Sequence, residues 1–110
     1  MNAYVLDGWA ALGDPTRRTI FARIAAAPRA VGELADTLPV SRPAVSQHLK
    51  ILKDARLVLD ERAGSRRIYR VNQEGLDQMR AELDSFWNDT LNAYKRLVEQ
   101  PDHDSTGGTP

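Results

Sequence analysis

The sequence lacks cysteine entirely, and it has only two histidines and few aromatic side chains. Without cysteine there is no disulfide, no thiolate metal ligand and no cysteine nucleophile. No apolar run approaches the roughly 18 residues that a membrane helix needs. The first residues, MNAYVLDGWAALGD, have no basic start, no uninterrupted apolar stretch and no small-residue cleavage site, so no export signal is expected. We therefore expect a cytoplasmic protein that does not associate with membranes.

Groups suited to catalysis are equally scarce. An enzyme would need a nucleophile beside a base, paired carboxylates in a cleft, or a bound metal ion. Neither His48 nor His103 has a partner at metal-ligand spacing, and no histidine is placed to activate a serine. We expect no catalysis, no cofactor and no metal.

The net charge of zero conceals a strong segregation along the chain. Residues 41–71 carry eight cations and three anions, a net charge of +5, whereas residues 72–110 carry three cations and eight anions, a net charge of −5. Such asymmetry is expected where one surface meets phosphate and another must not. Taken alone, it fits ordinary variation among solvated faces about equally well.

Apolar spacing and turn residues predict a mainly α domain with a small β-hairpin. We expect the domain to cover residues 1–99, followed by a polar, glycine-rich and disordered tail at 100–110. Helices are expected over 3–13, 15–26, 31–37, 42–54 and 74–100, and strands over 57–59 and 68–71 around a turn at 63–65.

The fourth of these helices, capped by Ser41, has two unlike faces. At 100° per residue, Val45, Leu49 and Leu52 lie within about 60° of one another and must face the core. The opposite face is polar and suits the major groove, where Gln47 would pair with adenine and Arg42 would reach guanine or phosphate. Helices three and four therefore form a helix-turn-helix. The residues expected to bind DNA from this segment are Ser41, Arg42, Pro43, Ser46, Gln47, His48 and Lys50.

Three arginines surround the glycine of the expected hairpin tip: Arg62, Arg66 and Arg67. In a winged helix, the tip of the hairpin lies along a neighbouring groove of the DNA and its phosphates. Arginines at this tip are therefore placed to contact DNA. Tyr69 and Val71 share one face of the second strand and are expected to pack inward, whereas Arg66 and Arg70 share its other face. The pattern predicts a winged helix-turn-helix whose partner is double-stranded DNA.

The last helix carries an apolar row with nearly the helical period. About 25 residues make a helix roughly 37 Å long, which is more apolar surface than so small a core covers. We expect a homodimer built on the first and last helices, although packing within one subunit is the alternative. A small apolar ligand near Trp9, Phe86 and Trp87 would explain those aromatics equally well. The expected interface residues are Val5, Trp9, Leu12, Leu83, Phe86, Trp87, Leu91, Tyr94 and Val98.

Four runs resemble the ArsR family of winged-helix regulators: LGDPTRR at 12–18, VGELA at 31–35, VSRPAVSQHLKILK at 40–53 and GSRRIYRV at 64–71. The resemblance implies a dimeric repressor that releases or retains its operator according to a signal. Metal-sensing members carry cysteines in the third helix or Asp/His sets in the last, and this sequence has neither, which indicates the metal-independent branch. Ala30 stands where relatives usually have a capping threonine, a loss worth about 1 kcal/mol.

The function predicted from these features is sequence-specific transcriptional regulation, with binding to an imperfect palindrome through the major groove. The alternative is a winged helix that docks on another protein and has no sequence-specific DNA binding. That use would require an exposed apolar patch on 41–53 or an aromatic cluster on the wing, and the sequence has neither. The identity of any small-molecule effector does not follow from the sequence.

Overall fold

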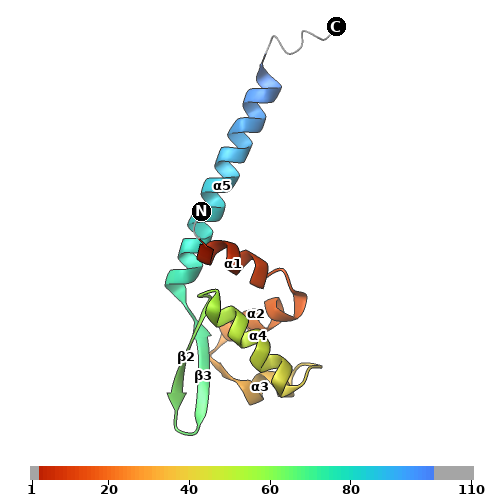
Figure 1. Ribbon diagram of the computed structural model, residues 1–110, viewed down its shortest axis with the longest axis vertical. Coiled ribbons are helices and arrows are strands. Elements are labelled where there is room, and N and C mark those ends of the chain that lie inside the picture. The colour runs from red at the N-terminus through yellow and green to blue at the C-terminus, as the bar shows by residue number, and fades with distance from the viewer. Residues whose placement is uncertain (1–2, 101–110) are drawn as a thin grey trace. The chain divides into compact units, whose positions relative to one another are not determined.

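The computed structural model describes residues 3–100 of the chain, with side chains described from residue 7 onward (Figure 1). It falls into two parts, one ending at Arg80 and one beginning at Ala81. The predicted class, mainly helical with a small antiparallel sheet, is confirmed. The elements are α1 Ala3–Ala11, α2 Pro15–Ala26, β1 Arg29–Ala30, α3 Val31–Asp36, α4 Arg42–Asp54, β2 Val58–Ala63, β3 Arg66–Val71 and α5 Gln73–Glu99.

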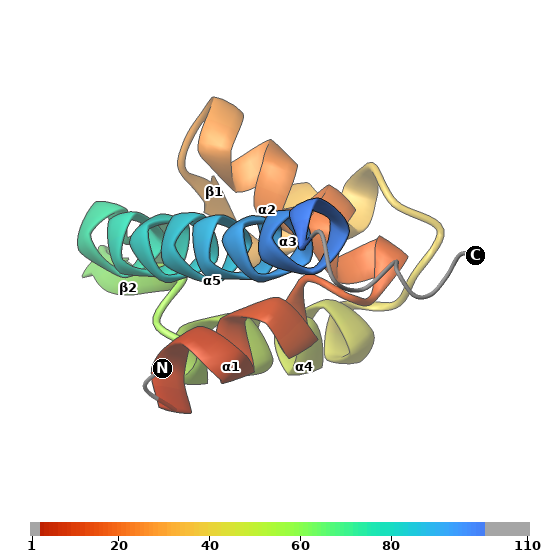
Figure 2. The same ribbon diagram turned by 90° about the horizontal axis from the view of Figure 1, so that it is seen from above.

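The core of the first part lies where α2, α3, α4 and the start of the hairpin meet. Val45, Leu49 and Leu52 of α4 are fully buried, as the helical periodicity predicts. They pack with apolar residues of the neighbouring elements, and α1 lies against the same helix (Figure 2). The inward side of α4 is thus fixed, which leaves its other side facing away from the core. The remaining fully buried large side chains are Ile20, Ile24, Leu34, Leu57 and Val58.

The sheet is antiparallel with strand order β1-β3-β2. Its hairpin is longer than predicted, because Ala63 pairs with Arg66 and leaves only Gly64 and Ser65 in the turn. Gly64 adopts φ 65°, which the first position of a type II′ turn requires. Charged residues occupy the outer half of the hairpin, so apolar alternation could not reveal it. The two-residue β1 was not predicted and pairs only with Tyr69 and Ile68.

The turn that follows α4 lies against the start of α5. Leu57 N–H donates to the carbonyl of Leu52 and Arg56 N–H to that of Lys53, each at 3.0 Å, which is the Schellman pattern. Arg56 adopts φ 64° at the position that glycine usually fills. Asn72 Nδ2 donates to the Arg56 carbonyl at 3.0 Å, and a methyl group on Gly75 would overlap that carbonyl oxygen. The residues just before β2 and just after β3 are therefore held together at the base of the hairpin.

The second part contains one described element, the remainder of α5. A single helix has no other element within that part to cover its apolar side chains, and these are exposed. No helix among residues 3–100 has the length and apolarity to span a bilayer. The tail expected to be disordered lies outside the described residues from 101 onward. The exposed apolar residues are Leu83, Phe86, Trp87, Leu91, Tyr94, Leu97 and Val98.

Candidate nucleic-acid interface

The first turn of α4 is built to present its side chains outward. Ser41 caps the helix, with its Oγ accepting from the N–H of Ala44 at 3.2 Å. Pro43 stands in the first turn, where its missing N–H costs no hydrogen bond. Because the core residues occupy the opposite side, the predicted face is open to solvent. The exposed members are Ser41, Arg42, Pro43, Ser46, Gln47 and Lys50.

His48 differs from these residues because it is only partly exposed and faces α2. Its Nδ1 lies 3.3 Å from Nη1 of Arg17. Arg17 also donates from Nε to the carbonyl of Ala11 at 2.7 Å and from its backbone N–H to the Asp14 carboxylate at 2.8 Å. That backbone N–H is the main cause that holds the pKa of Asp14 below its ordinary value. Sequence periodicity did not identify Arg17, which links the start of α2 to α4.

Lys50 forms an ion pair with Asp54, one turn further along α4, at 2.9 Å. Both side chains are about two-thirds exposed, at 70% and 65%. Exposed pairs of this kind contribute little to stability. Lys50 can therefore exchange its carboxylate partner for a phosphate at small cost.

The wing arginines are paired more extensively than their spacing suggested. Arg66 Nη2 lies 3.2 Å from Glu33 Oε1 on α3, Arg67 Nη1 lies 2.9 Å from Asp60 Oδ2 on β2, and Arg70 Nε lies 3.0 Å from Glu61 Oε1 on β2. These partners come from a remote helix or the facing strand. Local sequence spacing alone could not reveal them.

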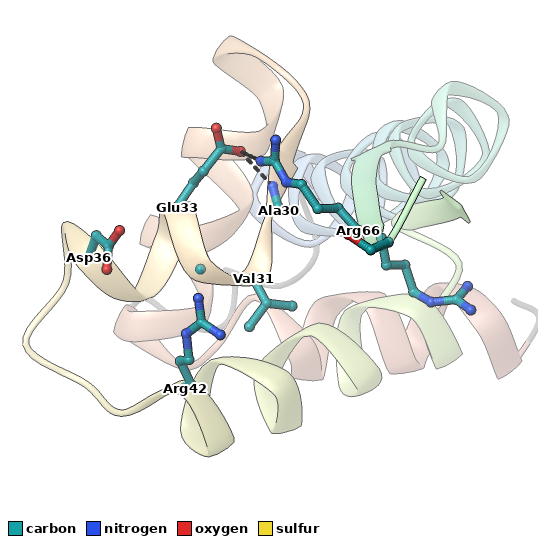
Figure 3. Close-up of a pocket in the computed structure, with 9 residues that line it drawn as sticks. Ala30, Val31, Glu33, Asp36, Arg42 and Arg66 are labelled. Atoms are coloured by element: carbon teal, nitrogen blue, oxygen red, sulfur yellow. Dashed lines mark hydrogen bonds and ion pairs between the residues drawn. The ribbon is translucent and has the colours of Figure 1, made fainter. Parts of the chain in front are cut away.

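A cleft of about 450 Å³ lies between α3, the first turn of α4 and the wing tip (Figure 3). Arg42 points toward α3, and its guanidinium fills the space that a side chain at Gly32 would occupy. Glu33 accepts from the N–H of Ala30 at 2.8 Å as well as from Arg66. The Ala30 N–H, followed by Arg66, lowers the pKa of Glu33. Glu33 thus supplies half of a capping box, which offsets the threonine missing at Ala30.

Asp60 is the most enclosed carboxylate of this region, with its side chain only 7% exposed. Lys53 Nζ lies 2.9 Å from Oδ1, and Arg67 Nη1 lies 2.9 Å from Oδ2. The hydrogen bond from Lys53, with a smaller contribution from Arg67, lowers the pKa of Asp60 against the opposing effect of burial. The sequence indicated only an anion within a basic segment.

The residues expected to form a dimer interface differ in their surroundings. Trp9 and Leu12 are partly buried, and Leu12 packs against the core of its own first part. Val5 falls outside the residues whose side chains are described. The expected residues of α5, namely Leu83, Phe86, Trp87, Leu91, Tyr94 and Val98, are exposed.

Residues 12–61, which span α2 to β2, match a helix-turn-helix domain family. The chain is 55% identical over 97 residues to the HTH-type transcriptional regulator Rv2034 of Mycobacterium tuberculosis, covering 88% of this chain and 91% of that protein. A solved ArsR-like transcriptional regulator from Rhodococcus sp. RHA1 superposes with a TM-score of 0.74 and 32% identity over 89% of this chain and 95% of that one. The chain belongs to the ArsR family of winged helix-turn-helix regulators.

Membership makes this ArsR-family chain a DNA-binding transcriptional regulator, and the protein-docking alternative is not favoured. A further solved relative is the homodimeric winged helix-turn-helix DNA-binding domain Mb0332 of Mycobacterium bovis. It has a TM-score of 0.63 and 27% identity, covering 78% of this chain and 80% of that one. In the present chain, α3 and α4 are the helix-turn-helix, and β2 and β3 are the wing.

Proposed function

We propose that the chain acts as a homodimeric repressor that binds an imperfect palindrome, with α4 of each protomer in the major groove. The observation that carries the proposal is the division of α4 into a buried apolar side and an exposed polar side. An amphipathic helix whose polar side is open, at the second position of a helix-turn-helix, fits the major groove. Such a regulator works where the DNA is, which in a bacterial cell is the cytoplasm.

Side-chain chemistry divides the proposed contacts into two kinds. Gln47 reaches the base edges, where it pairs with adenine, and Ser46 serves a base or a phosphate. Arg42 turns away from Gly32 to reach guanine or phosphate. The capped helix start, Lys50 and the wing arginines contact phosphates, which fix the position of the protein without selecting sequence. His48 contributes through its contact with Arg17 or by reaching a phosphate.

The dimer is proposed from the exposed apolar row of α5. Contiguous apolar surface of this kind marks an interaction site. A second copy covers it with a two-fold arrangement and places two α4 helices about 34 Å apart, one turn of DNA. The homodimeric state of the Mycobacterium bovis relative supports this assembly.

Selection from a random duplex library, followed by sedimentation of the protein with the selected DNA, tests the proposal. We expect a two-fold related consensus, a complex of two chains on one duplex, and affinity that falls steeply with salt because phosphate contacts release counterions. Transcription from a promoter that contains the selected site should fall when the protein is added. Binding without sequence preference, or a single chain on an asymmetric site, would contradict it.

A further inference from the structure

Asp60 is a nearly buried carboxylate on β2, one of the two strands of the wing. Its side chain is 7% exposed, whereas that of the adjacent Glu61 is 63% exposed. Asp and Glu are seldom enclosed unless they are paired, because removing the charge from water is costly. The cations that pair with Asp60 therefore indicate what this enclosed carboxylate does.

The two oxygens of Asp60 bind cations from two different elements. Lys53, on the last turn of α4, reaches Oδ1, and Arg67 on β3 reaches Oδ2, both at 2.9 Å. Asp60 itself lies on β2 and pairs with Tyr69, so Arg67 is its diagonal neighbour across the hairpin. One carboxylate thus joins the end of α4 to both strands of the wing.

The outer hairpin has little else to hold it. β1 pairs with β3 only at Tyr69 and Ile68, so the strands beyond them form a two-stranded ribbon. Such ribbons are marginal by themselves in water. A further ion pair with the body is Arg66–Glu33, in which both side chains are about half exposed. In the Asp60 pairs the cations are also about half exposed, at 51% for Lys53 and 47% for Arg67, but the shared carboxylate is only 7% exposed and both contacts are shorter, at 2.9 Å against 3.2 Å. An enclosed carboxylate is screened less by water than an exposed one, so we expect the Asp60 pairs to be the stronger.

We propose that Asp60 is a positioning residue for DNA binding, which fixes the wing relative to α4 through Lys53 and Arg67. The inference rests on the proposed function, since it concerns how α4 and the wing meet one duplex. With the wing held in advance, less ordering accompanies binding. Arg67 acts chiefly through Asp60, while Arg62 and Arg66 remain the wing cations that contact phosphate.

Asp60→Asn and Glu61→Gln form a matched pair that separates position from charge. Each removes one negative charge from β2, so each strengthens the general attraction to phosphate to a similar degree. Only Asp60→Asn breaks the link to α4, because Glu61 pairs with Arg70 within the hairpin. Full-length variants are first compared by circular dichroism to establish that both fold.

Titration of the selected operator at one salt concentration is then expected to show Asp60→Asn binding about tenfold more weakly than Glu61→Gln, the scale set by ordering two long side chains on binding. Amide hydrogen exchange of residues 62–67 in the DNA-free protein should be faster in Asp60→Asn alone. Equal affinity and equal exchange in the two variants would overturn the inference. Absence of any preferred operator for the unaltered chain would instead defeat the proposed function.

Lys53→Met provides the second variant if Asp60→Asn does not fold. It keeps the Asp60–Arg67 pair within the hairpin and removes the link to α4. The wing amides should then exchange faster than in Glu61→Gln, a comparison that requires no DNA. Unchanged exchange in Lys53→Met would show that α4 does not hold the wing through Asp60.

Discussion

Gln47 occupies the exposed side of α4, one residue before the partly buried His48 and two before the buried Leu49. Its amide offers a donor and an acceptor, as the edge of adenine requires. Gln47→Ala is expected to lower discrimination between the operator and base-substituted sites by about 1–3 kcal/mol, with a smaller effect on random DNA. Competition binding measures this, with the exposed Gln78→Ala of α5 as the control. Equal losses on operator and random DNA would contradict a base contact by Gln47.

Asp60 also makes the free energy of unfolding depend on pH. Lys53 above all, and then Arg67, hold the pKa of Asp60 below its unfolded value, so the carboxylate stabilises the fold at pH above that unfolded value, about 4. This contribution is lost as the pH falls through the folded pKa. Denaturant unfolding should therefore show Asp60→Asn less stable than the unaltered chain at pH 7, with the difference shrinking below about pH 4. A difference that stays constant down to pH 2 would show that the charge of Asp60 is not responsible.

Gln47 and Asp60 differ in how much of their surroundings the sequence alone predicts. The exposed position of Gln47 was predictable because the helical period fixes its direction once Leu49 and Leu52 face the core. The contacts of Asp60 were not, because they depend on the hairpin register and on where the last turn of α4 meets β2. The same holds for Arg17 and His48, which lie 31 positions apart in the chain.

We expect the wing to contribute charge to DNA binding more than sequence recognition. Arg66 is about half exposed and can leave Glu33 for a phosphate. Arg66→Ala is expected to weaken binding to operator and random DNA alike and to reduce the slope of log affinity against log salt by about one. Titrations at several salt concentrations measure both effects, with Arg96→Ala on α5 as the charge-matched control. An unchanged slope would exclude a phosphate contact by Arg66.

The limits of each element were predictable to different degrees. The caps of α2 and α4 follow from Asp14-Pro15 and Ser41, and these helices begin where the sequence indicates. The strands of the wing extend beyond their apolar residues because the antiparallel ladder continues through charged positions as far as Ala63 and Arg66. Hydrogen bonding between strands does not require apolar side chains, so hydrophobic alternation underestimates an exposed hairpin.

At the scale of the whole molecule, the charge segregation along the chain corresponds to separate structural elements. The basic segment 41–71 contains α4 and the wing, while the acidic segment begins just before α5. Several cations of the basic segment are paired with carboxylates of the same chain. We expect Lys50 and Arg66 to exchange their carboxylate partners for phosphates when the protein binds DNA, whereas Lys53 and Arg67 keep Asp60. The fold and the exposed polar side of α4 were predictable from one sequence, whereas the ion pairs of these cations depend on contacts between different elements.

We expect the assembly of two chains to depend on the exposed apolar row of α5. Trp87 is central to that row and 57% exposed, so a second copy that covers it would gain a large apolar contact. Trp87→Glu places a charge there and is expected to yield monomers by sedimentation. Their operator affinity should fall steeply, because two half-sites are no longer engaged by one linked particle. Asn92→Glu introduces the same charge away from the row and should remain dimeric. A dimer that survives Trp87→Glu would move the interface elsewhere, whereas monomers from both variants would indicate that added charge, and not the loss of this contact, separates the chains.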